Sequence, residues 1–202
     1  MTSQEPRCGW ALSSADYLEY HDTEWGNPVR DDVSLFERLA LESFQSGLSW
    51  ITVLRKRAAF RECFAGFDPV HVAEFSSSKV SELLQDARII RHRGKIEATI
   101  TNARAVLALW ERSGVGTLTD VLTEVAPTDA SLTAQGFTRP PAHIREIPSQ
   151  CAETAALAKR LKQAGFVFLG PTTLYSALQA TGFVNDHILG DRKSTRLNSS
   201  HT

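Results

Sequence analysis

The chain has 202 residues and a mass of 22.3 kDa, which suits one domain with a substantial core. The formal net charge of −1 excludes a globally basic surface, so any site for nucleic acid must be local. Three scattered cysteines argue against a disulfide framework and favour a reducing compartment. No apolar run approaches the roughly 20 residues of a membrane helix, so we expect no membrane partner and a cytoplasmic location.

The first part of the chain has the apolar spacing of helices. Ser14 is predicted to cap a first helix, and Asp32 is predicted to cap a second. Gly47 is predicted to end the second helix, and Ser49 to begin a third. Ser78 is predicted to begin a short fourth helix, which a tight connection follows.

Helical spacing continues in the second part. A long helix is predicted at about 95–110, loops and short helices at 114–148, and two further helices at 154–163 and 171–182. Alternating strand patterns are almost absent. The sequence therefore predicts an all-α fold, with residues 7–190 as a single domain of two helical lobes.

Residues 191–202 differ from the rest of the chain. They are polar and lack periodicity, so disorder is predicted. They also resemble translated sequencing-adapter text. The hypothesis is that this tail is non-native and that the native carboxyl terminus is missing from about residue 191.

Three side chains of metal-ligand type lie near the two ends of the chain: Cys8, His21 and His187. If they meet in space, one ion joins the ends, next to a set of aromatic residues. Their spacing is not that of a zinc finger, and a lone Cys or His is more often a packing or surface residue.

A basic segment separates the fourth helix from the long one. It contains Arg91, His92, Arg93, Gly94 and Lys95. Open backbone N–H groups at a helix start, together with cationic side chains, suit a phosphate group. On spacing alone, an ordinary helix corner with a solvated basic face is slightly favoured.

Several blocks, in order along residues 7–190, resemble the type I 3-methyladenine-DNA glycosylases. The blocks are Arg7-Cys8-Gly9-Trp10, Tyr20-His21-Asp22-Thr23-Glu24-Trp25-Gly26, Leu41-Glu42, Gly47 to Leu54, Ile89 to Ile96, Asn102 to Ala105 and Asn185-Asp186-His187. The resemblance implies a helix-hairpin-helix superfamily fold, a structural Zn²⁺ and a monomeric enzyme of DNA repair. The implied activity is hydrolytic excision of 3-methyladenine from double-stranded alkylated DNA by a monofunctional N-glycosylase, which leaves an abasic site.

The resemblance also implies a base-binding pocket. Methylation at N3 makes adenine cationic and a good leaving group, so the enzyme must mainly flip out the base and recognise it. Aromatic faces attract such a ring by about 0.5–2 kcal/mol per contact. Glu42 is expected to read the exocyclic amine and to stabilise the transition state as the catalytic residue. The implied aromatic residues, with Trp25 as a support, are Trp10, Tyr17, Tyr20 and Trp50.

Without the resemblance, these residues have ordinary explanations. Each aromatic residue alone is more often part of a core, and Glu42 is more often a solvated residue at the edge of a helix.

The resemblance further implies that Gln45, Gly47 and Leu48 approach the duplex and fill the gap left by the base.

The chain departs from the family pattern at two positions. The fourth zinc ligand of the family is a cysteine where this chain has Asp191, so a Cys/His/His/Asp site is one option and a weaker three-ligand site is the other. Arg88 replaces a common glycine; if that position needs a positive φ, Arg88 costs roughly 1 kcal/mol or more.

Two other functions remain open from the sequence. One is a zinc hydrolase that uses His21, Asp22 and Glu24 around an ion with an open coordination position. The other is a noncatalytic DNA-binding module of the helix-hairpin-helix type.

Overall fold

The computed structural model describes residues 6–194. All regular secondary structure within these residues is α-helix or 3-10 helix. The predicted all-α class is therefore confirmed. The α-helices are α1 (Ala15–Thr23), α2 (Asp32–Gln45), α3 (Trp50–Cys63), α4 (Pro69–Ala73), α5 (Ser77–Leu83), α6 (Arg93–Ser113), α7 (Thr117–Val125), α8 (Asp129–Ala134), α9 (Ala152–Gln163) and α10 (Pro171–Ala180). The 3-10 helices are η1 (Gly9–Ser13), η2 (Ala65–Phe67) and η3 (Ile144–Glu146).

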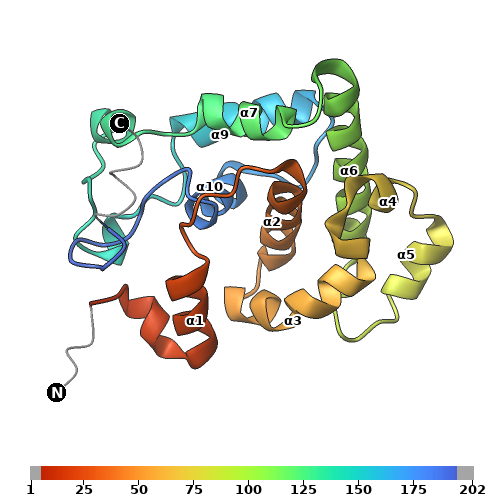
Figure 1. Ribbon diagram of the computed structural model, residues 1–202, viewed down its shortest axis with the longest axis horizontal. Helices are drawn as coiled ribbons and strands as arrows, with labels where there is room; N and C mark the ends of the chain where they lie inside the picture. The colour runs from red at the N-terminus through yellow and green to blue at the C-terminus, as the bar shows by residue number, and fades with distance from the viewer. Residues whose placement is uncertain (1–5, 195–202) are drawn as a thin grey trace.

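Helix α2 lies near the middle of the molecule and packs against α3, α6, α7 and α10 (Figure 1). Helices α4, α5 and α6 lie on one side of it, whereas α1 and the described segment after α10 lie on the other. No helix in the described residues has the length and apolarity needed to cross a membrane.

The helix starts agree with the sequence except for shifts of one or a few residues. Ser14 caps α1 as predicted, and Gly47 follows α2 with a φ of 83°. The cap of α2 is Asp31, not Asp32. The buried Asp32 carboxylate instead accepts hydrogen bonds from the Trp110 indole and from Thr119 at the start of α7. Two adjacent aspartates have the same cap propensity, so only tertiary contacts separate their roles.

The later boundaries show the same pattern. Ser76 rather than Ser78 caps α5, and His92 caps α6, which is longer than the predicted helix. The segment 114–148 contains α7, α8 and η3, in agreement with the prediction of loops and short helices.

Phenylalanine rings fix the junction between α2, α3 and η2. Phe44 lies 4.6 Å from Phe60, and Phe64 stacks on Phe67 at 5.4 Å. All four are fully buried. Burial of such side chains stabilises the fold by about 1.5–3 kcal/mol each, and it holds the end of α3 against the end of α2.

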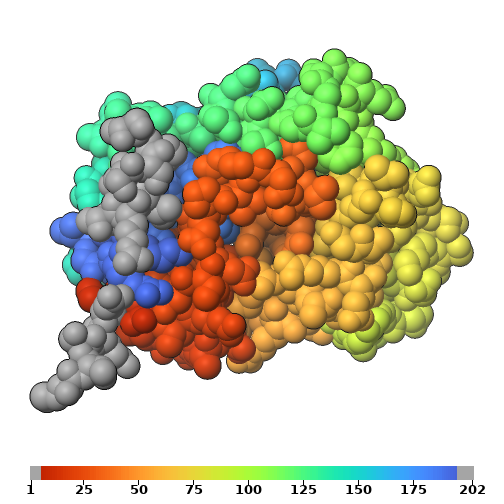
Figure 2. Space-filling view, viewed as in Figure 1, coloured from red at the N-terminus to blue at the C-terminus, as the bar shows by residue number. Residues whose placement is uncertain are grey.

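The first residues of the segment predicted to be disordered pack against the body of the protein. Asp191, Lys193 and Ser194 are buried, and the Lys193 ammonium donates hydrogen bonds to the carbonyls of His21 and Trp25. The remainder of the predicted tail, 195–202, lies outside the described residues. In Figure 2 the N-terminal segment, in red, lies beside the segment near the other end of the chain, in blue.

Arg88 does not adopt the strained conformation that the family glycine suggested. The described non-glycine residues with positive φ are Ala65, Phe67 and Phe168. The Arg88 guanidinium pairs with Asp86 at 2.8 Å and with Glu62 at 2.7 Å. The cost predicted for this position therefore does not arise.

Candidate active site and metal centre

A cavity of about 250 Å³ opens where η1, α1, α2, α3 and α10 meet. The structure brings together the four aromatic residues that the sequence singled out, and Trp25 joins them. Trp10 contacts Tyr17 edge-on at 5.6 Å, and Tyr20 lies 5.6 Å from Trp50. The aromatic lining consists of Trp10, Tyr17, Tyr20, Trp25 and Trp50. Such a lining offers several ring faces and edges to one flat molecule.

The polar lining comes from α2 and α10. Glu42 and Gln45 project from α2, and Ser176 and Gln179 from α10. Ser176 and Gln179 were not among the residues predicted from the sequence. Their signal is a polar pair three residues apart, with Ala177 and Leu178 between them, which places both side chains on one face of the helix.

Glu42 is a buried carboxyl group with only 5% of its surface exposed. Burial raises the pKa of Glu42 to about 7, and the positive charge of Arg38, one turn earlier on α2, opposes that rise. Both protonation states are therefore populated near neutral pH. A cationic ligand in the cavity favours the ionised form, because an opposite charge lowers the pKa of a carboxyl group.

Two contacts fix the aromatic walls relative to each other. The backbone N–H of Ile51, in the first turn of α3, donates to the Tyr17 hydroxyl at 2.9 Å. The Arg38 guanidinium carbon lies 5.5 Å from the centre of the Tyr20 ring and 5.2 Å from that of Trp50. Arg38 was not predicted from the sequence, because an arginine on a helix has no distinctive pattern.

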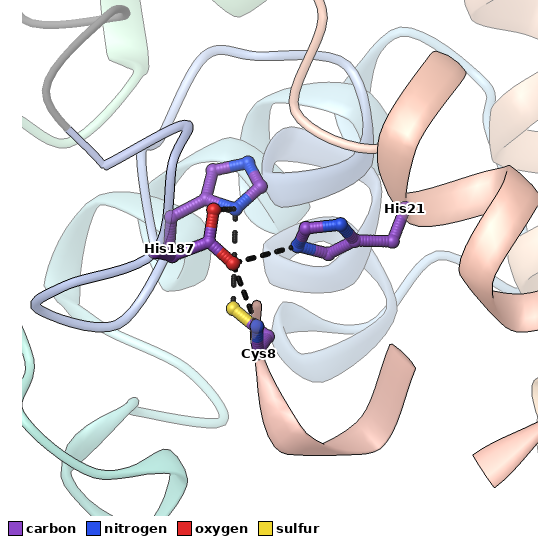
Figure 3. A group of neighbouring side chains, drawn as sticks. Cys8, His21 and His187 are labelled. Atoms are coloured by element: carbon purple, nitrogen blue, oxygen red, sulfur yellow. Dashed lines mark hydrogen bonds and ion pairs between the residues drawn. The ribbon is translucent and has the colours of Figure 1, made fainter. Parts of the chain in front are cut away.

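The metal-type ligands from the two ends of the chain do meet. Figure 3 shows Cys8, His21 and His187 pointing toward one another. Together with Asp191 they form a buried group whose ligand atoms all lie within 4.8 Å of each other. Single separations are 3.9 Å from Cys8 Sγ to His187 Nδ1 and 3.0 Å from His21 Nε2 to an Asp191 carboxylate oxygen.

This group fits a tetrahedral cation. Zinc bonds of about 2.0–2.3 Å place neighbouring ligand atoms roughly 3.3–3.8 Å apart, close to the separations found. His21 Nε2 is buried, and its polar neighbour within residues 6–194 is the Asp191 carboxylate oxygen at 3.0 Å, itself a candidate ligand of the same cation. Burial lowers the pKa of His187 to about 3, so this imidazole is neutral as a ligand must be. Burial raises the pKa of Cys8 to about 12, so a nearby cation is what would make it a thiolate.

The residues of the zinc hydrolase alternative are otherwise engaged. Asp22 accepts a hydrogen bond from Arg7 and contacts His21 Nδ1 at 2.9 Å, where it orients the ring. Glu24 forms a two-pronged pair with Arg57. Four protein ligands also leave no open position in a tetrahedron, so the arrangement suits a structural ion.

The metal-type cluster supports the wall of the cavity. The Trp25 ring lies 4.6 Å from that of His187, and the Trp10 ring lies 5.3 Å from that of His21. A change at the cluster therefore reaches two aromatic residues of the pocket directly.

The candidate DNA-binding residues fall into two groups. Arg91, His92 and Arg93 are exposed before and at the start of α6, and Leu48 is 43% exposed. Lys95 was expected to contact phosphate from an exposed position, but it is buried. Its ammonium donates hydrogen bonds to the carbonyl of Phe44, at 2.9 Å, and to that of Ser46, at 2.6 Å.

This geometry changes the interpretation of the basic segment. Lys95 satisfies the carbonyls on either side of Gln45, the last residue of α2, and so holds both this helix end and the loop that contains Gly47 and Leu48. The backbone N–H of Lys95 is also engaged, since it donates to His92 Nδ1. The sequence showed a cation in a basic cluster but not that it faces inward.

Comparison with known proteins identifies the family of the chain. The family model described as methyladenine glycosylase matches residues 10–192. DNA-3-methyladenine glycosylase 1 of Escherichia coli (strain K12) is 47% identical over 184 residues, which is 91% of this chain and 94% of the relative.

Solved structures give the same result. A crystal structure of 3-methyladenine DNA glycosylase I superposes with a TM-score of 0.83 at 44% identity and covers 93% of this chain and 98% of the other. A variant of 3-methyladenine DNA glycosylase I in complex with 3-methyladenine superposes with a TM-score of 0.82 at 32% identity, over 93% of this chain and 97% of the other. The chain therefore belongs to the methyladenine glycosylase family.

Proposed function

We propose that this protein is a monofunctional DNA N-glycosylase that excises 3-methyladenine from double-stranded alkylated DNA, as a step of base excision repair. The observation that carries the proposal is a cavity walled by aromatic rings and containing a buried carboxyl group. Relatives named for this activity, and one solved in complex with 3-methyladenine, support it.

The cavity suits a cationic purine. In DNA, 3-methyladenine carries a positive charge, which aromatic faces attract more strongly than a neutral base. The ionised Glu42 complements that charge and accepts a hydrogen bond from the exocyclic amine. Because the cationic base is already a good leaving group, the protein mainly contributes extrusion, positioning and a negative charge near the developing oxocarbenium ion. The bond from C1′ to the base breaks, water supplies the new hydroxyl group, and an abasic site remains.

The lining of the cavity supports hydrolysis without strand cleavage. Cleavage by β-elimination needs an amine nucleophile at the sugar. Among the described residues that line the cavity there is no lysine. Lys95, the lysine at the nearby loop, is held by two carbonyls.

DNA would approach the cavity across two neighbouring surfaces. The exposed Leu48 side chain and the loop beside it would fill the gap left by the flipped-out base. Arg91, Arg93 and the start of α6 would contact phosphates, with α5 and α6 as the two helices of a helix-hairpin-helix unit. Lys95 would position the loop from inside and not contact DNA.

The metal-type cluster would hold a structural Zn²⁺ through Cys8, His21, His187 and Asp191. A bound zinc ion would supply cross-linking of the two chain ends and no chemistry at the base. In this proposal residues 7–190 form one glycosylase domain of two helical lobes, which acts as a monomer in the cytoplasm.

The test is incubation with methylated duplex DNA, followed by chromatography of the released bases and electrophoresis of the DNA. We expect free 3-methyladenine and intact strands until alkali is added. Trp50→Ala should abolish release while largely retaining salt-sensitive DNA binding. Binding without release of any base by the unaltered protein would favour a noncatalytic DNA-binding module and refute the proposal.

A further inference from the structure

A row of hydrogen-bonded polar side chains connects Asp186, the residue before His187, to the cavity. Asp186, which precedes His187, is 1% exposed, and one of its carboxylate oxygens accepts a hydrogen bond from the Arg139 guanidinium. Its other oxygen accepts a hydrogen bond from the side-chain Nε2 of Gln179, at 2.6 Å. Gln179 in turn lines the cavity.

This row fixes which way the Gln179 amide points. A carboxylate paired with a guanidinium can only accept hydrogen bonds, so the amide must turn its NH₂ group toward Asp186. The amide oxygen, Oε1, must then lie on the opposite side. Within residues 6–194, no side chain or backbone group donates a hydrogen bond to this Oε1, and the oxygen is not enclosed. The cavity is therefore provided with a fixed acceptor that is open to a ligand.

A second acceptor faces the same cavity from a neighbouring helix. Glu42 lies on α2, Gln179 lies on α10, and these two helices pack against each other. The cavity thus offers two hydrogen-bond acceptors, the Glu42 carboxylate and the Gln179 amide oxygen, and the orientation of the second is fixed. Purines differ in whether their 6-substituent can donate hydrogen bonds to this pair. The 6-amino group of an adenine has two N–H donors, whereas the 6-oxo group of a guanine has only acceptor lone pairs.

We propose that Gln179 is a specificity-determining residue, which accepts one N–H of the 6-amino group while Glu42 accepts the other. The pair thereby selects methylated 6-aminopurines over methylated 6-oxopurines. This inference rests on the proposed function. A guanine lesion in the same place would set its carbonyl oxygen against the Gln179 oxygen and the ionised form of Glu42, which a cationic lesion favours. None of the three would then have a donor, which is costly in a site shielded from water.

In this assignment Asp186 is a positioning residue. It contacts no base, but it determines that an acceptor and not a donor faces the cavity. Arg139 holds Asp186 from the other side and is itself nearly buried, with 3% of its side chain exposed.

The test uses the full chain with Gln179→Met, which keeps the size of the side chain and removes its acceptor. Duplex DNA methylated to contain both 3-methyladenine and 3-methylguanine is the substrate, and both free bases are quantified over time. We expect release of 3-methyladenine to fall about five- to tenfold, as for the loss of one hydrogen bond. Release of 3-methylguanine should stay the same or rise, so the ratio of the two rates falls at least fivefold.

A purely structural role would not change that ratio. Gln163→Met, at the exposed end of α9, is the matched control and should leave both rates unchanged. An unchanged ratio in Gln179→Met, whether both rates fall or neither does, overturns the assignment. If the unaltered protein releases neither base, the proposed function itself fails.

A second measurement needs no variant. Quenching of tryptophan fluorescence by the free bases reports occupancy, because three tryptophans line the cavity. The unaltered protein should bind 3-methyladenine at least fivefold more tightly than 3-methylguanine. Equal affinity for the two bases would overturn the role of Gln179 even if Gln179→Met failed to fold.

Discussion

The guanidinium of Arg38 donates a hydrogen bond to the hydroxyl of Tyr20 at 2.8 Å. The same guanidinium lies beside the Trp50 ring and is one helical turn before Glu42. One side chain therefore touches two aromatic walls of the cavity and provides the positive charge that opposes the raised pKa of Glu42.

We expect Arg38→Gln to reduce release of 3-methyladenine about tenfold and to raise the pH at which activity is half-maximal. The reason is that loss of the positive charge favours the protonated form of Glu42, whereas the proposed function needs the ionised form. The measurement is the rate of base release between pH 5 and pH 9. Arg160→Gln, which removes an exposed arginine paired with Glu124, is the control. A lower rate with an unchanged pH profile would contradict the electrostatic part of this explanation.

Glu42→Gln should have opposite effects on activity and on stability. Release of base should fall about 100-fold, since a charge that stabilises the transition state is lost. The pKa of Glu42 is about 7 in the folded protein, above its ordinary value of 4.5. Between these two pH values the carboxyl group ionises in the unfolded chain before it ionises in the folded one. The free energy of unfolding therefore falls as the pH rises through this interval. At pH 8 the substitution should therefore raise the free energy of unfolding by roughly 2–3 kcal/mol, and near pH 4 it should have little effect. Urea unfolding at both pH values is the measurement; the same gain at each would show that the effect is not one of ionisation.

Asp191→Cys should tighten zinc binding. A thiolate is a better zinc ligand than a carboxylate oxygen, and the position already faces Cys8, His21 and His187. Competition with a chromophoric chelator measures the affinity, which we expect to rise at least tenfold.

Removal of zinc from the unaltered protein should lower its melting temperature and weaken binding of free base, because Trp10 and Trp25 pack on the cluster. A purified protein without zinc, whose melting temperature zinc does not change, would contradict the metal site.

Lys95→Met should separate positioning from phosphate contact. The substitution leaves the carbonyls of Phe44 and Ser46 without their donor, which costs about 1–3 kcal/mol of stability and loosens the loop before α3. We expect slower excision from duplex DNA, nearly normal binding of free 3-methyladenine and an unchanged dependence of DNA binding on salt. Arg93→Gln is the contrasting variant: it should lower the salt slope by about one. A similar loss of slope in Lys95→Met would show that Lys95 contacts phosphate after all.

Helical periodicity was sufficient to predict the all-α fold, since the spacing of apolar residues depends on the local chain. It could not distinguish Asp31 from Asp32, because the role of Asp32 depends on Trp110 and on Thr119 at the start of α7, which are distant in sequence. Arg88 shows the same limit. Its backbone turned out to be unstrained, which a comparison of residue types at one position cannot reveal.

The pocket was predictable in part. Motifs identified the aromatic residues and Glu42, and the structure places them around one cavity. Arg38, Ser176 and Gln179 were not identified, because each is an ordinary helix residue until the packing of α1, α2 and α10 is known. Lys95 was predicted to contact phosphate, whereas its ammonium points inward and donates to backbone carbonyls. The sequence shows the charge of this residue, but only the fold shows the direction of its side chain.

The cluster formed by Cys8 and His21 with His187 and Asp191 has a consequence for synthesis of the protein. Its first two residues leave the ribosome early, and its last two leave only when nearly all of the described chain has been made. Trp10 and Trp25 cannot obtain their final support from His21 and His187 before then. A nascent chain can thus form its helices during translation, but it cannot complete the aromatic cavity until His187 and Asp191 have been made.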